Sequence, residues 1–141
     1  MKRFYRCVCL LLVMTMLMAV PAFAAEARAS DYFWSSSVYL DKRSTVTFEA
    51  WFDVDAVSTM DVLGASEIKI QQSSDGENWT TVKTFTKESY SNLICKDTAS
   101  HASYVTYTGT AGYYYRAKIT LYAKKGTGSG EWTRYTSSLK L

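Results

Sequence analysis

Residues 46–54, with the sequence VTFEAWFDV, alternate strictly between apolar and polar positions. One parity carries Val46, Phe48, Ala50, Phe52 and Val54, and the other carries Thr47, Glu49, Trp51 and Asp53. A period of two is typical of a β-strand that buries one face. The stretch therefore predicts a strand with an apolar inner face and an outer face that carries a tryptophan between two carboxylates.

Residues 66–86 predict a β-hairpin further along the chain. Ile68 and Ile70 mark the first strand, and residues 79–85 form the returning one. Between them, Asp75 and Gly76 supply turn chemistry, because glycine accepts a positive φ and aspartate bonds its own backbone.

The rest of the chain continues the pattern of short strands separated by turns. Further strands are expected at residues 32–40, 91–96, 102–108, 113–122 and 132–139, with turns at 109–112 and 126–130. Residues 56–65 are expected to form a loop or one short turn of helix. Strands at this spacing predict an all-β fold, an antiparallel two-sheet sandwich of seven or eight strands.

Residues 112–117, GYYYRA, resemble the penultimate strand of immunoglobulin-like and fibronectin type III-like domains. The resemblance implies an inward tyrosine, Tyr113 or Tyr115 by parity, that bonds back to the preceding corner. Residues 73–79, SSDGENW, resemble a hairpin found in extracellular β-sandwiches, including discoidin-like carbohydrate-binding modules. The whole chain is similar to small exported proteins of Gram-positive bacteria.

The N-terminus predicts export. Lys2, Arg3 and Arg6 precede an apolar run over residues 8–20, and Pro-Ala-Phe-Ala follows at 21–24. This order is that of a secretory signal peptide, here a signal helix cleaved after Ala24. We therefore expect a flexible lead-in at 25–31, a β-sandwich domain at 32–141, and a secreted product without a stable membrane anchor.

Removal of the signal peptide changes the composition of the chain. The full sequence has 16 basic and 13 acidic residues, and residues 1–24 hold three of the basic ones and none of the acidic ones. The expected product is therefore neutral, which argues against a nucleic-acid partner. Cys95 becomes the sole cysteine, and its parity with Leu93 favours a buried thiol over a disulfide between chains.

Candidates for catalysis are few, so we expect neither an enzyme nor a cofactor. His101 is the only histidine, and its small polar neighbours predict a loop. A pair of Cys95 and His101 would need the fold to bring them together. Asp53, Asp55 and Asp61 follow the strong strand, but their spacing matches no EF-hand loop, so no metal site is predicted.

Outward aromatic residues are the best indication of function. Trp51 lies between Glu49 and Asp53, and Tyr114 and Tyr122 flank Arg116 and Lys118 on the polar face of their strand. Such rings suit a sugar or a protein surface. We therefore predict a secreted, non-catalytic module that binds an extracellular glycan or protein, with these residues as its site.

Three alternatives remain open at this point. The first is a self-associating surface or matrix protein that pairs through an edge strand or Cys95. The second is a secreted effector or toxin, and the third is a hydrolase. The sequence leaves the oligomeric state undetermined.

Overall fold

The computed structural model describes residues 28–141, so the predicted signal peptide and its cleavage after Ala24 lie outside the described residues. A 3-10 helix η1 occupies Ala29–Asp31, within the expected lead-in. The strands are β1 (Phe33–Lys42), β2 (Thr47–Ser73), β3 (Thr80–Thr86), β4 (Ile94–Thr108), β5 (Tyr114–Lys125), β6 (Gly128–Tyr135) and β7 (Leu139–Lys140), and a second 3-10 helix, η2, occupies Ser91–Leu93. The prediction of an all-β fold is confirmed.

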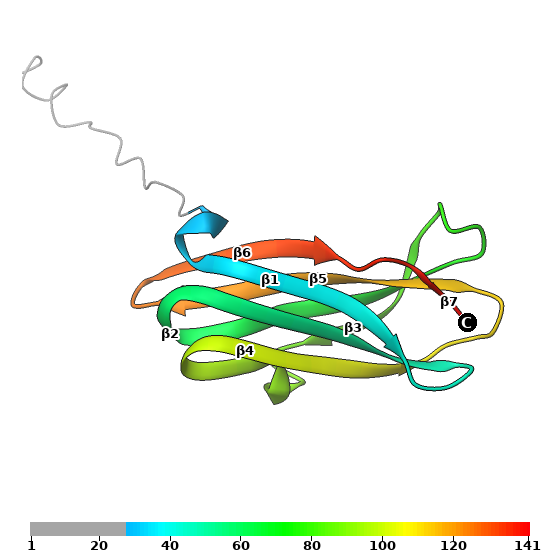
Figure 1. Ribbon diagram of the computed structural model, residues 1–141, viewed down its shortest axis with the longest axis horizontal. Helices are drawn as coiled ribbons and strands as arrows, with labels where there is room; N and C mark the ends of the chain where they lie inside the picture. The colour runs from blue at the N-terminus through cyan, green and yellow to red at the C-terminus, as the bar shows by residue number, and fades with distance from the viewer. Residues whose placement is uncertain (1–27) are drawn as a thin grey trace, which may run out of the picture.

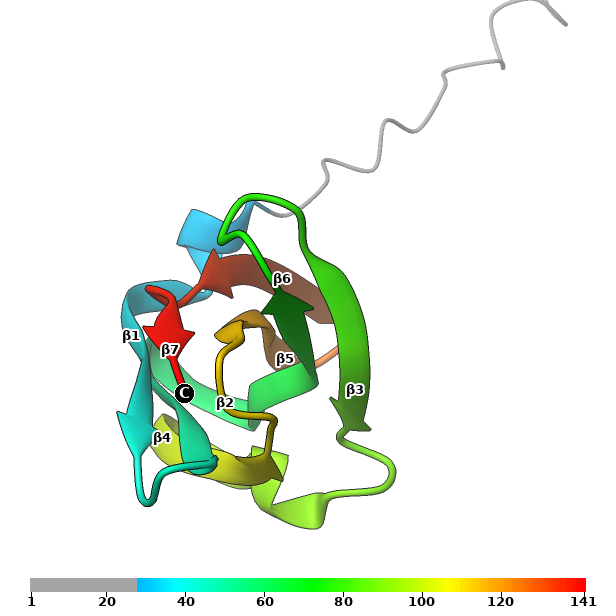
Figure 2. The same cartoon turned by 90° about the vertical axis from the view of Figure 1, so that its right-hand side faces the viewer.

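Strand β2 connects the whole molecule. Its residues 47–55 and, beyond a register shift, 60–64 pair with β4 on one edge, and residues 48–56 pair with β1 on the other. Its residues 62–73 pair with β5, and 67–72 pair with β3 on the opposite edge. Because β6 and β7 join β5, all seven strands belong to one curled sheet (Figures 1 and 2). The expected division into two separate sheets is not shown.

We name the two parts of this sheet after the long strand that each contains. The β4 half comprises residues 47–55 of β2 with β1 and β4, and the β5 half comprises residues 62–73 of β2 with β3, β5, β6 and β7. Both halves bury apolar side chains in one shared core. The rings of Phe48, from the β4 half, and Tyr115, from the β5 half, meet there at 5.3 Å between centroids. The outer faces of the two halves therefore point away from each other.

The alternation that predicted the strong strand is confirmed. Its inner residues Phe48, Ala50, Phe52 and Val54 are all fully buried. In β5, Tyr115, Ala117, Ile119 and Leu121, which alternate with the polar face predicted for this strand, are buried. Tyr113 is 38% exposed because it precedes the strand. The hydroxyl of the buried Tyr115 accepts a hydrogen bond of 2.8 Å from the backbone N–H of Thr110. Of the two candidates, Tyr115 is thus the tyrosine that bonds back to the corner.

A loop or one short turn of helix was expected at residues 56–65, but these residues form the middle of β2. Two register shifts make this possible, one between Asp55 and Met60 and one between Ala65 and Glu67. They interrupt the period of two, which hid the strand from the sequence pattern. Gly64 lies between them at φ +152°, and a Cβ at this position would clash with the carbonyl oxygen of Leu93.

The two weak strands predicted at 91–96 and 102–108 are one strand, β4, which η2 precedes. Leu93 is buried in η2, but Cys95, on β4, is exposed, so the buried thiol was a wrong prediction. Because Leu93 belongs to the 3-10 helix, it shares no strand parity with Cys95.

The predicted hairpin is confirmed in β2 and β3. Asp75 organises its turn by accepting hydrogen bonds of 2.8 Å from the backbone N–H groups of Glu77 and Asn78. The Ser73 hydroxyl donates to the same carboxylate at 2.7 Å. These bonds favour the charged form, led by those from Asn78, and hold the pKa of Asp75 well below its usual range.

Candidate functional site

Three aromatic side chains form a row across the outer face of the β4 half. Tyr39 of β1, Trp51 of β2 and Tyr104 of β4 are direct neighbours in the strand register. The Tyr39 and Trp51 rings are parallel to within 3° at 6.1 Å between centroids. The Trp51 and Tyr104 rings are 4.3 Å apart at 29°. We call these residues the aromatic row, in which the rings stack against one another and Trp51 lies in the middle.

A fixed carboxylate lies beside the aromatic row. Glu49 accepts hydrogen bonds from the Trp51 indole Nε1 at 2.9 Å and from the Arg43 Nε at 2.8 Å. Arg43 also forms an ion pair with Asp41 at 3.2 Å. The hydrogen bond from Arg43, followed by the one from Trp51, lowers the pKa of Glu49. Glu49 therefore stays ionised at neutral pH and keeps the indole in one orientation.

The outer rings of the aromatic row are open to solvent. Tyr39 is 46% exposed and Tyr104 is 40% exposed. Next to Tyr104 lies a hollow of about 530 Å³, lined by Phe85, Tyr90, Asn92, Ser103 and neighbouring residues of β4. The Asn92 amide closes one side of it by donating to the Ser103 hydroxyl and to the Tyr104 carbonyl oxygen, both at 3.0 Å. The aromatic row thus adjoins a recess that is lined by both apolar and polar side chains.

The structure divides the predicted site into two surfaces. Trp51, Glu49 and Asp53 lie together on the outer face of the β4 half, at alternate positions of β2. Tyr114, Tyr122 and Arg116 lie on β5, on the outer face of the other half. Since these two faces point away from each other, one small ligand cannot contact all six residues.

The side chains of the β5 half combine cations with aromatic rings. The Arg116 guanidinium lies 4.4 Å from the ring centroid of Trp79 and 4.9 Å from that of Tyr135. Its Nε donates a hydrogen bond of 2.8 Å to the Gln71 side-chain oxygen. Elsewhere on this half, the Lys87 ammonium lies 3.7 Å from the Tyr122 ring and that of Lys140 4.9 Å from the Tyr114 ring. Each predicted tyrosine here is therefore partly covered by a lysine.

Sequence reasoning missed Tyr39, Tyr104 and Arg43. Tyr39 and Tyr104 each lie in a predicted strand, but only the pairing of β1 and β4 with β2 places both beside Trp51. Alternation gives the face on which a side chain lies and not its neighbour across the strands. No local signal therefore indicated the row.

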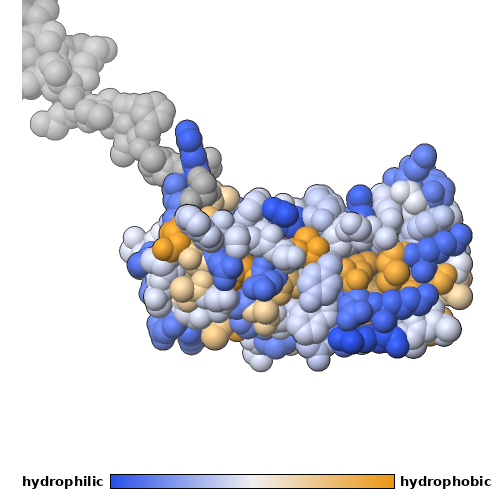
Figure 3. Space-filling view, in the orientation of Figure 1, coloured by the Kyte–Doolittle hydropathy of each residue, from blue (hydrophilic) through white to orange (hydrophobic). Residues whose placement is uncertain are grey.

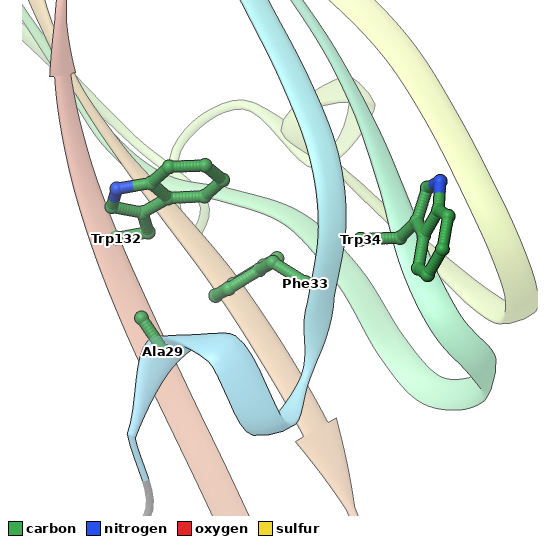
Figure 4. A pocket seen from close by; sticks show the side chains of 4 residues that line it. All are labelled: Ala29, Phe33, Trp34 and Trp132. Carbon is green, nitrogen blue, oxygen red and sulfur yellow. The ribbon is translucent and has the colours of Figure 1, made fainter.

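A second hollow, of about 400 Å³, lies near η1 and is lined by Ala29, Phe33, Trp34 and Trp132. Figure 4 shows Ala29, Phe33 and Trp132 turned toward one another, whereas Trp34 lies on the other side of β1. Trp34 is 79% exposed, at the register shift in β1. Figure 3 shows hydrophobic atoms in an interrupted stripe along the molecule. The lining of this hollow holds no charged side chain, which makes it a weaker candidate than the aromatic row.

The catalytic candidates are kept apart. His101 belongs to β4 and not to a loop; its Nε2 lies 3.0 Å from the Asn92 carbonyl oxygen, and its ring packs edge-on against Phe52. Cys95 is six residues away on the same strand, about 20 Å at the rise of an extended chain. The structure therefore does not form the Cys–His pair.

Asp53, Asp55 and Asp61, the three aspartates that follow the strong strand, do not combine into a cation site. Asp55 accepts a hydrogen bond of 2.8 Å from the Ser35 hydroxyl, and Asp61 one of 2.7 Å from the Gly126 backbone N–H. The bond from Ser35, followed by one from Ser100, lowers the pKa of Asp55. Within residues 28–141, no three His, Cys, Asp or Glu side chains are grouped so that they could hold a metal ion. In the same part of the chain, no helix has the length and apolar character to cross a membrane.

No protein-family model matches the sequence, and a search of curated proteins finds no match. A search of solved structures finds Spo0M, a sporulation control protein from Bacillus subtilis, with 10% sequence identity and a TM-score of 0.40. The alignment covers 73% of this chain and 49% of Spo0M, so the chain spans about half the length of that protein. A likeness of this size identifies neither a family nor a function.

Proposed function

We propose that the protein is an exported, non-catalytic module that binds an extracellular glycan on the aromatic row. The observation that carries the proposal is the row itself, three rings aligned across three neighbouring strands with two of them at least 40% exposed. A stacked cross-strand pair also stabilises a sheet. A third ring, the open ends of the row and the fixed Glu49 go beyond what sheet stability requires.

A neutral sugar fits the chemistry of this surface. The exposed parts of Tyr39 and Tyr104 present apolar ring surface with polar edges, which suits the C–H face of a sugar ring. Glu49, Asp53 and Asp41 supply carboxylate oxygens that accept hydrogen bonds from sugar hydroxyls. Arg43 is already engaged by Asp41 and Glu49, so this surface has little attraction for an anionic ligand. Among glycans, the expected partner is therefore a neutral polysaccharide and not an anionic one.

The remaining expectations fit the same proposal. We propose that the signal peptide directs the chain out of the cell and is removed, so that the module acts in the extracellular space without a membrane anchor. We further propose that the curled sheet is an immunoglobulin-like sandwich whose two layers share β2. Support comes from the corner hydrogen bond of Tyr115 and from the two halves, which pack on one core.

Titration calorimetry with neutral oligosaccharides, such as cellohexaose and chitohexaose, tests the proposal. The combined change Trp51→Ala and Tyr104→Ala removes the centre of the row and should weaken binding by about 10-fold or more, as for other aromatic anchors. Trp34→Ala is the matched control, because Trp34 is highly exposed and lies outside the row. Binding that survives the double change, or that Trp34→Ala weakens equally, would contradict the assignment of the site.

A second candidate function, self-association, is favoured by one specific observation. Cys95 is exposed, so its thiol is accessible to a thiol of another chain. Size-exclusion chromatography with and without reductant tests this candidate. A dimer that disappears with reductant and in Cys95→Ser supports it, and a monomer under oxidising conditions contradicts it.

A further inference from the structure

The two halves of the sheet carry opposite net charge. Residues 28–61 and 94–113, which include the first part of β2 with β1 and β4, hold four basic and seven acidic residues. Residues 62–93 and 114–141, which include the rest of β2 with β3, β5, β6 and β7, hold nine basic and five acidic residues. The near balance of residues 28–141, with 13 basic and 12 acidic residues, thus conceals a division between a net acidic and a net basic half. A surface charge of one sign attracts ligands of the other.

The basic charge is concentrated at neighbouring positions of the outer face. Arg116 and Lys118 are two residues apart on β5, about 7 Å along the strand. Lys69 of β2 is the direct cross-strand neighbour of Lys118, and Gln71 is that of Arg116. Tyr135 of β6 is the neighbour of Lys118 on the other edge. We call Lys69, Arg116 and Lys118, with Trp79 and Tyr135, the basic surface.

Stability does not explain this arrangement. Like charges directly opposite each other in a sheet are destabilising, yet Lys69 and Lys118 occupy such positions. Lys69 has a partner in Glu67, at 2.7 Å. Within residues 28–141, Arg116 and Lys118 form no ion pair with a carboxylate. Two cations at the centre of the surface therefore remain available to an external anion.

Arg116 is held ready for such an anion. The rings of Trp79 and Tyr135 and the hydrogen bond from its Nε to Gln71 fix the guanidinium plane. Its two terminal nitrogens are not used by any side-chain hydrogen bond within the described residues, and they match the two oxygens of a carboxylate or phosphate. Because the side chain is already ordered, little conformational entropy is lost when a ligand binds.

We propose that the basic surface is a second binding site and that it takes an anionic polysaccharide. Arg116 grips one carboxylate or phosphate group with its terminal nitrogens, and Lys118 and Lys69 neutralise the next group along the polymer. A glycan fits better than single-stranded nucleic acid, which binds by stacking bases on open aromatic rings. Here the Arg116 guanidinium already lies against the rings of Trp79 and Tyr135. The site is independent of the aromatic row, on the opposite side of the molecule.

Titration calorimetry on the protein beginning at residue 25 tests this proposal with two anionic polymers, polygalacturonate and poly(ribitol phosphate). At about 50 mM salt, Arg116→Gln combined with Lys118→Gln should weaken binding of at least one polymer by about 10-fold or more, and added salt should weaken the parent similarly. Arg116→Lys keeps the charge but loses the fork, so we expect an intermediate loss. Lys42→Gln, on β1 in the other half, removes an exposed charge as a control and should change the affinity less than about 2-fold. Thermal unfolding of each variant verifies that the fold is retained.

The two polymers distinguish a carboxylate from a phosphate as the preferred group. Dextran, an oligothymidylate and phosphatidylglycerol vesicles serve as comparison ligands. Anionic glycan binding that is lost in the double variant but kept in Trp51→Ala supports the proposal, whatever the aromatic row binds. The proposal is overturned if neither polymer binds, if dextran binds equally well, or if the double variant binds as the parent does. Tighter binding of the oligothymidylate or the vesicles would overturn the choice of a glycan.

Discussion

The two halves of β2 bury their inner side chains in the same core, but their outer faces carry different side chains. Phe48 and Phe52 in the β4 half and Ile68 and Ile70 in the β5 half are fully buried in one core. On the outside, the β4 half presents the aromatic row with carboxylates, whereas the β5 half presents arginine and lysine against aromatic rings. Only the inner parity is dictated by the core, so the outer parity of one strand is available for two different binding surfaces.

The largest effect on stability is expected at Gly64, in the part of β2 that joins the two halves. Gly64→Ala adds a Cβ that clashes with the Leu93 carbonyl oxygen at a positive φ. We expect it to lower the free energy of unfolding by about 3 kcal/mol or more, measured by urea denaturation. Gly112→Ala is the matched control, because φ is +91° there but nothing lies within 4 Å of the added Cβ. Its cost should be about 1 kcal/mol. Equal losses in the free energy of unfolding for the two variants would mean that Gly64 is needed for its positive φ alone and not for the close approach of Leu93.

The packing of one half on the other is tested next, at Tyr115. Tyr115→Phe keeps the ring against Phe48 but removes the hydroxyl that accepts the Thr110 N–H. We expect a loss of about 1 kcal/mol in the free energy of unfolding, the usual net value of such a bond. Tyr113→Phe, at an exposed tyrosine two residues earlier, should leave stability unchanged. If Tyr115→Phe is as stable as the parent, the hydrogen bond between Tyr115 and Thr110 does not contribute to the stability of the fold.

Acid should act on the β5 half through its hairpin turn. The pKa of Asp75 is lowered in the folded state, above all by hydrogen bonds from Asn78. The stability that it contributes is therefore present above its unfolded pKa of about 4 and is lost as the pH falls toward the folded value. Asp75→Asn should lower the melting temperature at pH 7 and remove this part of the acid dependence. Ser74→Ala, an exposed change in the same turn that removes no carboxylate, should keep the acid profile of the parent.

The smallest effect is expected at Arg43, in the β4 half. Arg43 lies at the surface, and exposed ion pairs contribute little to stability. Arg43→Gln should leave the melting temperature within experimental scatter but raise the pKa of Glu49 toward its ordinary value, measured by NMR titration. Lys42→Gln, which removes the adjacent charge, should leave that pKa unchanged. A large loss of stability would contradict the view that this ion pair serves the surface and not the fold.

Part of this molecule is predictable from local patterns. The strong strand, the Asp75–Gly76 hairpin and the inward side of β5 follow from alternation and turn chemistry, and the structure confirms them. These features depend on residues near each other in sequence. For the same reason, Trp51, Glu49 and Asp53 were correctly grouped, because alternate residues of one strand share a face.

Other features were beyond reach of the sequence. The middle of β2 escaped notice because its register shifts interrupt the period of two. Cys95 was misplaced because its neighbour Leu93 belongs to a 3-10 helix. The prediction that Trp51, Tyr114, Tyr122 and Arg116 form one site was wrong. Alternation separates buried from outward residues, but it does not say whether two outward faces lie on the same side of the molecule.

The sequence by itself determined that this chain is all-β, which faces of its main strands are buried, and where its main hairpin turns. Only the tertiary structure decided that Tyr39 and Tyr104 lie beside Trp51, and that one half of the sheet has a net negative charge and the other a net positive charge. The physical reason is the range of the interactions. Alternation and turns arise within a few residues, whereas register, bulges and the curl of the sheet depend on pairing between strands that are distant in sequence.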